Sequence, residues 1–269
     1  MSFDGKQLAH EILLTYKNRD WSQVKLVILQ TNNDVSSDAF IRQKMNACNT
    51  LGAQSELIKY HESVTEKELL EKIQQLNTDP EVTGIILQLP VYPHLKQNKL
   101  LKAIDPYKDV DYLTGNCPLP IRSCVVEAVL ILKEHFHHDF TNKQIVVVGL
   151  GVTGGGPIFH YLKETGHQVV GCDKHTPNTM ELIKTADVVI TAIGKPHFFK
   201  TTNFKPGVIL YDVGVSRNAL NKLCGDIDPN GIEKVAKWWS PTPGGVGPFT
   251  VLAIMKNLWV LYEAHQRRI

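Results

Sequence analysis

A glycine-rich loop follows a short run of β-branched residues and has the spacing of a phosphate-binding turn. Residues 145–148 read Ile-Val-Val-Val, and Gly149, Gly151 and Gly154 follow as GxGxxG. Such glycines permit a tight turn, a close backbone approach to a pyrophosphate and a close contact between helix and strand, while the N–H groups of the next helix face the anion. The pattern predicts a dinucleotide-binding βαβ unit. The alternative is a glycine-rich turn that serves packing alone.

An acidic residue stands where such a unit binds a ribose. Asp173 follows the next predicted strand, residues 168–172, and lies 19 positions after Gly154. A carboxylate there accepts a hydrogen bond from a ribose 2′-hydroxyl and repels a 2′-phosphate. The predicted cofactor-binding residues are Gly149, Leu150, Gly151, Gly154, Gly155, Asp173 and Lys174.

Two polar residues stand in apolar segments and are candidate site residues. Lys44 shares a predicted helix face with Phe40 and Cys48, and Gln88 lies near the end of the apolar run 84–90. A desolvated amine can be neutral near pH 7, because burial disfavours the ammonium form. Each residue also has a simpler interpretation, as a solvated lysine and as a hydrogen-bonded core amide.

The segments around these residues alternate between helix and strand patterns. The predicted helices are 3–17, 39–51, 69–76, 100–104, 125–135, 158–162, 180–184 and 250–264, and the predicted strands are 24–29, 57–60, 84–90, 145–148, 168–172, 187–192 and 208–213. Ser63 and Glu66 have the spacing of a capping box before the third helix. Asp111 ends an acidic turn and is either an ordinary turn acid or a ligand-binding carboxylate. The order predicts an α/β fold of two α/β domains, the second a Rossmann-type doubly wound parallel sheet.

Composition restricts the class of protein. The 269 residues carry a formal charge of +2 with dispersed lysines and arginines, so we expect no nucleic-acid partner. The absence of a long uncharged apolar window and of a secretion signal predicts a cytoplasmic protein with no membrane partner. The five cysteines are scattered, which predicts reduced thiols and no metal site. The histidines at 135, 137 and 138 follow a helix and are expected to be solvated.

Several separated segments together resemble one family, the methylenetetrahydrofolate dehydrogenase/cyclohydrolases of the FolD type. The last of the matching segments is close to a signature by itself, because so glycine-rich a loop before a C-terminal helix rarely arises by chance. In chain order the segments are Asp4-Gly5-Lys6, Phe40-x-x-x-Lys44, Gly84-Ile85-Ile86-Leu87-Gln88-Leu89-Pro90, Lys108-Asp109-Val110-Asp111, Ala186-Asp187-Val188-Val189, Ala192-Ile193-Gly194-Lys195-Pro196, Lys205-Pro206-Gly207, Asp212-Val213-Gly214, Gly225-Asp226-Ile227-Asp228 and Pro243-Gly244-Gly245-Val246-Gly247-Pro248.

The resemblance implies a fold and a reaction. Residues 1–117, completed by the C-terminal helix 248–269, would form the catalytic, folate-binding domain, and residues 118–247 a Rossmann dinucleotide-binding domain, with a catalytic cleft between them. The reaction would be oxidation of 5,10-methylenetetrahydrofolate to the methenyl form with NAD or NADP, followed by hydrolysis to 10-formyltetrahydrofolate. The partners would be the small-molecule folate and the dinucleotide, and members of the family are typically homodimers.

The resemblance also assigns roles to single residues. Lys44 would be the central catalytic residue, Gln88 would orient it, and Asp111 would accept hydrogen bonds from the pterin ring N–H and amino group. The substrate-binding residues would be Phe40, Pro243, Gly244 and Gly245.

The sequence departs from the family pattern at four places. Phe40 replaces a tyrosine, which removes a hydroxyl near Lys44, and the segment 119–124 replaces Pro-Cys-Thr-Pro-x-Gly. Leu150-Gly151 replaces an Arg-Ser pair, and Asp173-Lys174 replaces His-Ser. The last two changes favour NAD over the NADP that the family commonly uses, while the positive charge of Lys174 partly opposes this preference. Three hypotheses follow. The first is a working dehydrogenase, with or without cyclohydrolase activity, that uses NAD or tolerates both nucleotides. The others are a dehydrogenase with an impaired hydrolytic step, and a catalytically weak paralogue that binds folate or dinucleotide.

Overall fold

The computed structural model describes residues 3–267, which form two compact units. Residues 10–124 and 251–267 form the three-stranded unit, and residues 3–9 and 125–250 form the five-stranded unit. The bounds of α1, Gly5–Thr15, and of α8, Val246–Gln266, include residues of both units. The domain borders expected from the sequence, 117/118 and 247/248, stay predictions.

The three-stranded unit has a parallel sheet in the order β2-β1-β3. Its further elements are β1 (Lys25–Gln30), α2 (Val35–Leu51), β2 (Gln54–Lys59), α3 (Glu66–Thr78), β3 (Gly84–Gln88) and α4 (Gln97–Ala103), with a 3-10 turn at Tyr16–Asn18. The central strand β1 is buried along residues 26–30, as expected for a parallel strand covered on both faces.

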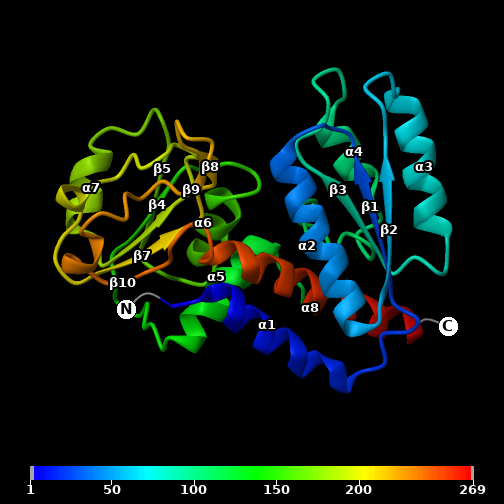
Figure 1. Cartoon of the computed structure of the whole chain (residues 1–269), viewed down its shortest axis with the longest axis horizontal. Coiled ribbons are helices and arrows are strands. Elements are labelled where there is room, and N and C mark those ends of the chain that lie inside the picture. Colours follow the sequence, from blue (N-terminus) through cyan, green and yellow to red (C-terminus); the bar gives the residue numbers. More distant parts are fainter. Residues whose placement is uncertain (1–2, 268–269) are drawn as a thin grey trace. The chain divides into compact units, whose positions relative to one another are not determined.

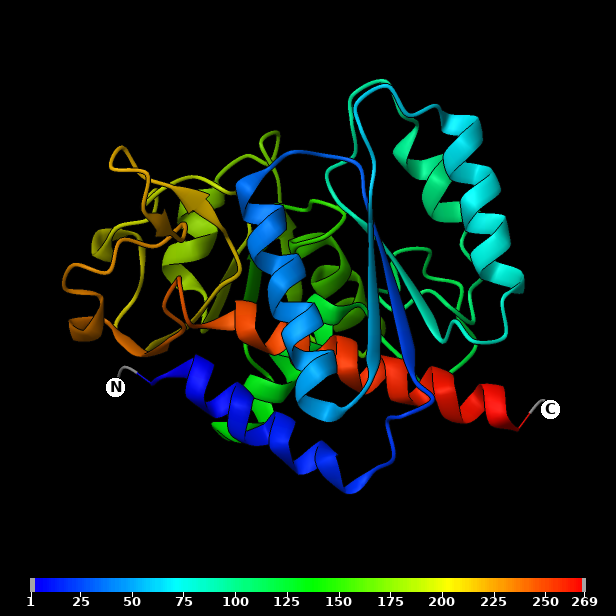
Figure 2. The same ribbon diagram turned by 45° about the vertical axis from the view of Figure 1, so that its right-hand side comes forward.

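Different helices cover the two faces of this sheet. Val27 and Leu29 of β1 share a buried cluster with residues of α3 and α4, among them Ile73 and Leu100. On α2, the Cys48 thiol lies 3.9 Å from the sulfur of Met255 in α8. Figure 2 shows α3 and α4 on one side of the strands and α2 on the other. The three-stranded unit is therefore a three-layer α/β sandwich.

The capping box of α3 is formed two residues later in the chain than predicted. The structure has Thr65 at the N-cap, where it accepts from the Glu68 backbone N–H at 3.2 Å, and the Glu68 carboxylate accepts from Thr65 N at 2.7 Å. Ser63 instead pairs with His61. Two overlapping [ST]-x-x-E patterns occur here, and the one in register with the buried face of α3, which begins at Leu69, forms the cap.

The five-stranded unit has a wholly parallel sheet in the order β10-β7-β6-β4-β5 (Figure 1). Its elements are α5 (Cys124–His135), β4 (Ile145–Val148), α6 (Gly155–Glu164), β5 (Val169–Cys172), α7 (Thr179–Thr185), β6 (Val188–Thr191), β7 (Val208–Asp212), β8 (Ser216–Arg217), β9 (Leu223–Cys224) and β10 (Ala236–Trp239), with 3-10 turns at Thr201–Asn203 and Ile232–Lys234. The strand order reverses between β4 and β6. Doubly wound sheets bind ligands at such a switch point, outside the carboxyl ends of the strands.

The predicted α/β fold with two units and a Rossmann-type sheet is confirmed, although some elements were not predicted. The edge strand β10 and the small β8–β9 hairpin were missed because they are short, four residues in β10 and two each in β8 and β9, and none contains a run of β-branched residues. Within residues 3–267 no helix is both long and apolar enough to cross a membrane.

Candidate active site

Lys44 lies on the buried face of α2. The helix begins after Asp34, whose side chain accepts from the Ser37 backbone N–H at 2.7 Å, and it ends at Gly52 in the left-handed conformation (φ 85°). Ile41 and Cys48 share the buried face with Lys44, whose exposure is only 7%. A buried amine needs nearby hydrogen-bond partners.

Gln88 supplies one of these partners. The Lys44 Nζ donates to Gln88 Oε1 at 3.0 Å, while Gln88 Nε2 donates to the carbonyl of Leu89 at 2.9 Å. With its amide nitrogen already engaged, Gln88 presents its oxygen to the lysine. The unusual polar residue at the end of the apolar strand β3 is therefore a hydrogen-bond partner of Lys44, and its role in catalysis stays a prediction.

Asp111 provides a negative charge near Lys44, beyond hydrogen-bond distance, and its neighbours fix its position. The Asp111 Oδ2 lies 3.9 Å from Lys44 Nζ. Lys108 and Asp109 hold the segment in place: the buried Lys108 Nζ donates to the carbonyls of Leu76 and Asp79, at 2.8 and 2.5 Å.

Asp109 secures the other side of the same turn. Its carboxylate accepts from the Thr114 backbone N–H at 2.9 Å and from the Thr114 hydroxyl at 2.7 Å. Burial raises the pKa of Asp109, and these hydrogen bonds offset part of that effect. In the motif 108–111, the first two charged residues are structural, and Asp111 alone faces Lys44.

Two residues near Asp111 were missed by the sequence reasoning. Asn257 of α8 donates through Nδ2 to the carbonyls of Val110 and Arg122, at 2.9 and 2.8 Å. Cys124 lies beside it, 3.6 Å from both the Asn257 amide and the Val110 carbonyl, and burial raises the pKa of its thiol. The available signal was an asparagine inside an apolar helix, since a buried amide requires partners.

The glycine loop of the five-stranded unit has the geometry of a ligand-binding turn. Gly149 has φ 92°, and a Cβ added there would lie 2.3 Å from the carbonyl oxygen of Ala192. A Cβ on Gly155 would lie 2.1 Å from the Gly149 oxygen. At Gly151, by contrast, an added Cβ would meet no protein atom within 4 Å, which leaves this backbone open to a ligand.

Helix α6 begins directly after this loop. Its N-cap, Gly154, has no side chain to accept from the first N–H groups of the helix. The Gly156 N–H donates to the Gly151 carbonyl at 3.1 Å and Pro157 has no N–H, so the attraction for an anion such as a pyrophosphate comes chiefly from the helix dipole. The loop therefore fits a dinucleotide, with its glycines serving conformation and close approach.

Both halves of the chain match known domains. Residues 3–111 match the catalytic domain of the tetrahydrofolate dehydrogenase/cyclohydrolases, and residues 123–266 match their NAD(P)-binding domain. The chain belongs to this family. "Bifunctional protein FolD" of Mycoplasma genitalium is 65% identical over 267 residues, which cover 99% of this chain and 98% of that protein.

Solved structures agree with the assignment to the dehydrogenase/cyclohydrolases. The bifunctional FolD enzyme of Campylobacter jejuni has a TM-score of 0.90 at 28% identity, covering 99% of this chain and 98% of its own. FolD of Trypanosoma brucei, solved with NADP cofactor and an inhibitor, has a TM-score of 0.90 at 25% identity and the same coverage. The predicted family membership is confirmed.

The other family positions predicted to bind folate are Phe40 and the loop 243–245, which belong to different units. Phe40 is half-buried on α2, one helical turn before the lysine. The loop 243–245 belongs to the five-stranded unit, where Pro243 is exposed and Gly244 has φ 96°. The structure brings Lys44, Gln88 and Asp111 together within one unit, and the role of the 243–245 loop stays a prediction.

At the predicted ribose position, Asp173 is exposed and is bonded to its own loop. Its Oδ1 accepts from the His175 backbone N–H at 2.9 Å and from the Thr176 hydroxyl at 3.0 Å. These hydrogen bonds lower the pKa of Asp173, so the carboxylate is charged at neutral pH. Leu150, which replaces the arginine common in the dehydrogenase/cyclohydrolase family, lies near Gly171 of β5.

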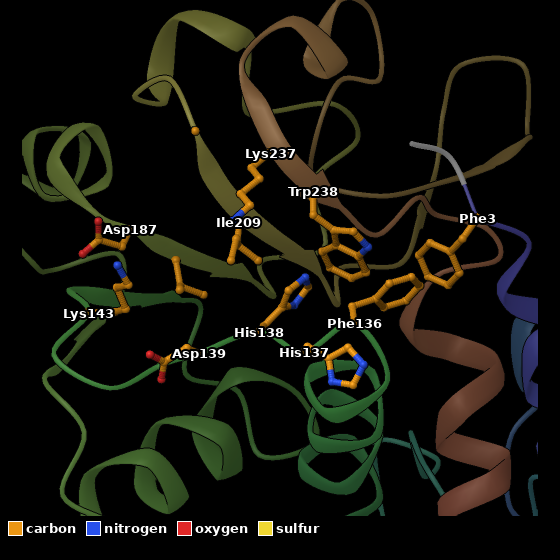
Figure 3. Close-up of a pocket in the computed structure, with 12 residues that line it drawn as sticks. Phe3, Phe136, His137, His138, Asp139, Lys143, Asp187, Ile209, Lys237 and Trp238 are labelled. Carbon is orange, nitrogen blue, oxygen red and sulfur yellow. The ribbon is translucent and has the colours of Figure 1, made fainter.

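A cavity of about 550 Å³ lies at the opposite ends of the strands and is a different site (Figure 3). Its aromatic wall consists of Phe3, Phe136, His138 and Trp238. Lys143 and other lining residues precede strands of the sheet, so the cavity is at the amino ends, away from the glycine loop.

His138, at the edge of this cavity, corrects one expectation. Its Nδ1 lies 2.6 Å from the hydroxyl of the fully buried Tyr211, so this histidine is not simply solvated. Burial lowers the pKa of His138 to about 4, and the nearby cations Lys237 and Lys133 add to the shift. His137, in contrast, is exposed.

Proposed function

We propose that this protein oxidises 5,10-methylenetetrahydrofolate to the methenyl form with a nicotinamide dinucleotide and hydrolyses the methenyl form to 10-formyltetrahydrofolate. The observation that carries the proposal is the buried Lys44, held by Gln88 at 3.0 Å and faced by Asp111 at 3.9 Å, in a chain of the dehydrogenase/cyclohydrolase family. A buried amine with one hydrogen-bond acceptor and a carboxylate nearby has the position and chemistry of a proton carrier.

The hydrolytic step needs such a carrier. Water that adds to the methenyl carbon must lose a proton, and the departing ring nitrogen must gain one. Lys44 in its neutral form takes the proton from water and, as the ammonium, delivers a proton to the nitrogen. Gln88 holds the amine in place through its fixed oxygen, and Asp111 stabilises the ammonium that forms.

Substrate orientation falls to Asp111 and to apolar and backbone surfaces. We assign to Asp111 a pair of hydrogen bonds from the pterin ring N–H and amino group, a geometry that a carboxylate matches well. Phe40 would contact the folate with its ring, and Pro243, Gly244 and Gly245 with a backbone surface free of bulky side chains.

The dinucleotide is assigned to the glycine loop. Gly149, Gly151 and Gly154 would hold the pyrophosphate against α6, with Leu150, Gly155, Asp173 and Lys174 around it, and the bound dinucleotide supplies the acceptor for the hydride that the folate loses. Asp173 is ionised and exposed, which suits a ribose 2′-hydroxyl and opposes a 2′-phosphate. We therefore propose NAD as the preferred nucleotide.

We further propose that the protein is a cytoplasmic homodimer. Cys48, Cys117, Cys124, Cys172 and Cys224 are all buried and unbridged, which suits a reducing compartment. The dimer is proposed because members of the family typically pair, and sedimentation of the purified protein tests it directly.

A spectrophotometric assay tests the proposed function. Purified protein is mixed with 5,10-methylenetetrahydrofolate and either NAD or NADP, and nicotinamide reduction and the loss of the methenyl chromophore are followed separately. We expect reduction with NAD and then decay of the chromophore. Reduction of neither nucleotide would contradict the function and favour a weak binding paralogue; preferred use of NADP would contradict only the assignment of NAD.

A dehydrogenase with an impaired hydrolytic step is the second candidate. Phe40 favours it, because a tyrosine at this position would place a hydroxyl one helical turn from Lys44. The two candidates separate in the second phase of the same assay, where an impaired enzyme accumulates the methenyl form. Restoration of hydrolysis by Phe40→Tyr would identify the missing hydroxyl as the cause.

A further inference from the structure

Two buried carboxylates of the five-stranded unit have no part in the chemistry above. Asp212 ends β7 with 2% exposure, and Asp226, after β9, is fully buried. Within residues 3–267 neither carboxylate forms an ion pair with a lysine or arginine. Burial raises the pKa of both groups, to about 7 for Asp212, and an arrangement this costly needs compensating hydrogen bonds.

Asp226 binds the backbone that follows β6. Its Oδ2 accepts from the Ile193 N–H at 2.7 Å and its Oδ1 from the Lys195 N–H at 2.8 Å. Gly194 between them has φ 68°, which brings both N–H groups to one side of the segment. One carboxylate thus fixes the conformation of residues 193–195.

Asp212 in turn binds the backbone of Asp226. It accepts from the N–H of Asp226 at 3.1 Å and from that of Ile227 at 3.0 Å. The Gly214 N–H and the Thr191 hydroxyl donate to the same carboxylate, both at 3.1 Å. The two acids therefore act in series: Asp212 holds the chain at Asp226, and Asp226 holds residues 193–195.

Each carboxylate also lies against a glycine that belongs to the other's motif. A Cβ on Gly214 would lie 2.2 Å from the Asp226 carboxyl carbon, and a Cβ on Gly225 would lie 2.0 Å from Asp212 Oδ2. The motifs Asp212-Val213-Gly214 and Gly225-Asp226 are thus reciprocal, because each supplies both a carboxylate and the space that the other carboxylate needs.

The segment held by Asp226 borders the crevice at the switch point of the sheet. It continues from β6, next to β4, and a Cβ on Gly149 would lie 2.3 Å from the oxygen of Ala192 and 3.0 Å from the Ile193 side chain. We propose that Asp212 and Asp226 are positioning residues for the dinucleotide, because they set the wall formed by residues 192–195 against the glycine loop. The proposal rests on the dinucleotide site assigned under the proposed function.

Direct binding tests the proposal. Asp226→Asn replaces one of two acceptor oxygens with a donor that faces a backbone N–H, and a lost hydrogen bond to a charged group corresponds to about tenfold or more in affinity. We expect the Kd for NAD, measured by calorimetry without folate, to rise by about tenfold, and the amides of Ile193 and Lys195 to exchange faster. The control Asp228→Asn alters an acid of the same segment that binds Lys200 and Asn230, so its Kd should match that of the unmodified protein.

Hydrolysis of the methenyl form serves as the internal reference, because it needs Lys44 and water but no dinucleotide. We expect Asp226→Asn to retain it within about twofold while dinucleotide affinity falls, since the site is altered only in one wall. The proposal would be overturned if Asp226→Asn lost hydrolytic rate and affinity for NAD to the same extent, or if its Kd for NAD equalled that of the unmodified protein.

A milder variant covers the case in which Asp226→Asn does not fold. Thr191→Val keeps the shape of the side chain and removes one of the four donors to Asp212, so we expect a rise of about twofold to tenfold in Kd. An unchanged Kd in the folded Thr191→Val protein would overturn the serial arrangement. Failure of the unmodified protein to bind NAD or NADP would instead overturn the dehydrogenase function, and it would be seen before any variant is compared.

Discussion

The two units prepare their candidate sites by different means. In the three-stranded unit, the proposed reactive group is a side chain held by other side chains. Lys44 is held by Gln88 and faced by Asp111, whose segment is secured by Lys108 and Asp109. In the five-stranded unit, the predicted ligand-facing groups are backbone atoms of the glycine loop and of residues 192–195, shaped by the absence of side chains and by two buried carboxylates.

Because of this difference, substitutions at the two candidate sites should affect different properties, the reaction rate at one and the ligand affinity at the other. A side-chain site changes its reaction when one functional group is removed, because the group itself carries the proton. A backbone site changes affinity when a neighbour moves it, because the N–H groups remain present in every variant. Substitutions in the first unit should therefore alter rate, and substitutions in the second should alter binding.

The largest effect is expected from Lys44→Met. Loss of a general acid–base group lowers a rate by about 10²–10⁴-fold, and methionine keeps the volume of the side chain without its amine. We expect hydrolysis of the methenyl form to fall by that factor, as followed by its absorbance. Arg42→Met, an exposed change on the same helix, serves as the control. Unimpaired hydrolysis in Lys44→Met would remove the amine from the mechanism.

The next effect should come from Gly151→Ala. The added methyl meets no protein atom within 4 Å, so we expect the free energy of unfolding to change by less than about 1 kcal/mol. The methyl would, however, occupy the space assigned to the pyrophosphate, so the Kd for NAD should rise by at least about tenfold.

Gly149→Ala is the informative partner of that variant. Here the methyl collides with the Ala192 carbonyl and the positive φ adds strain, so both stability and binding should fall. Chemical denaturation and calorimetry on the two variants separate conformation from ligand approach. If both variants lost stability and affinity together, the interpretation of Gly151 as a ligand contact would be wrong.

A smaller effect is expected on the choice of nucleotide. Asp173→Ser removes a charge that opposes a 2′-phosphate, so the ratio of kcat/KM for NAD to that for NADP should fall by about tenfold. The hydrolytic rate should not change, because the reactive side chains are in the other unit. An unchanged ratio would show that Asp173, bonded to His175 and Thr176, serves its own loop alone.

The smallest effect concerns stability near the cavity of the five-stranded unit. The pKa of His138 is lowered from 6.5 to about 4. Between pH 6.5 and pH 4, the histidine is therefore protonated in the unfolded chain and neutral in the folded chain. Stability should therefore fall as the pH drops from about 6.5 to 4, by roughly 1 kcal/mol after allowance for partial exposure. Urea unfolding of the unmodified protein and of His138→Gln measures this difference. A slope of the same size in the variant would assign it to other groups.

Residue type allowed much of this arrangement to be predicted. Gln88 was recognisable as a polar residue within an apolar run, whereas Lys44 was recognisable only through the family motif Phe40-x-x-x-Lys44. The GxGxxG spacing predicted the loop and the fold around it. The contacts of Asn257 and the serial bonds of Asp212 and Asp226 were not predictable, since they join positions far apart in the chain and run to backbone groups common to all residues. The N-cap residue of α3 was also not predictable, because Ser63 and Thr65 each begin a capping-box motif and only the register of the folded helix selects Thr65.

The fixed orientation of the Gln88 amide has a consequence for turnover. Because its nitrogen is tied to the Leu89 carbonyl, the oxygen faces Lys44 whether that amine is charged or neutral, and it can accept an N–H in both states. In the proposed mechanism, the Lys44 amine can therefore keep the same hydrogen bond to Gln88 before and after each proton transfer. A glutamate at position 88 would have a side chain of the same length but would add a negative charge. That charge favours the ammonium form of an adjacent lysine, so proton release to the substrate would be disfavoured.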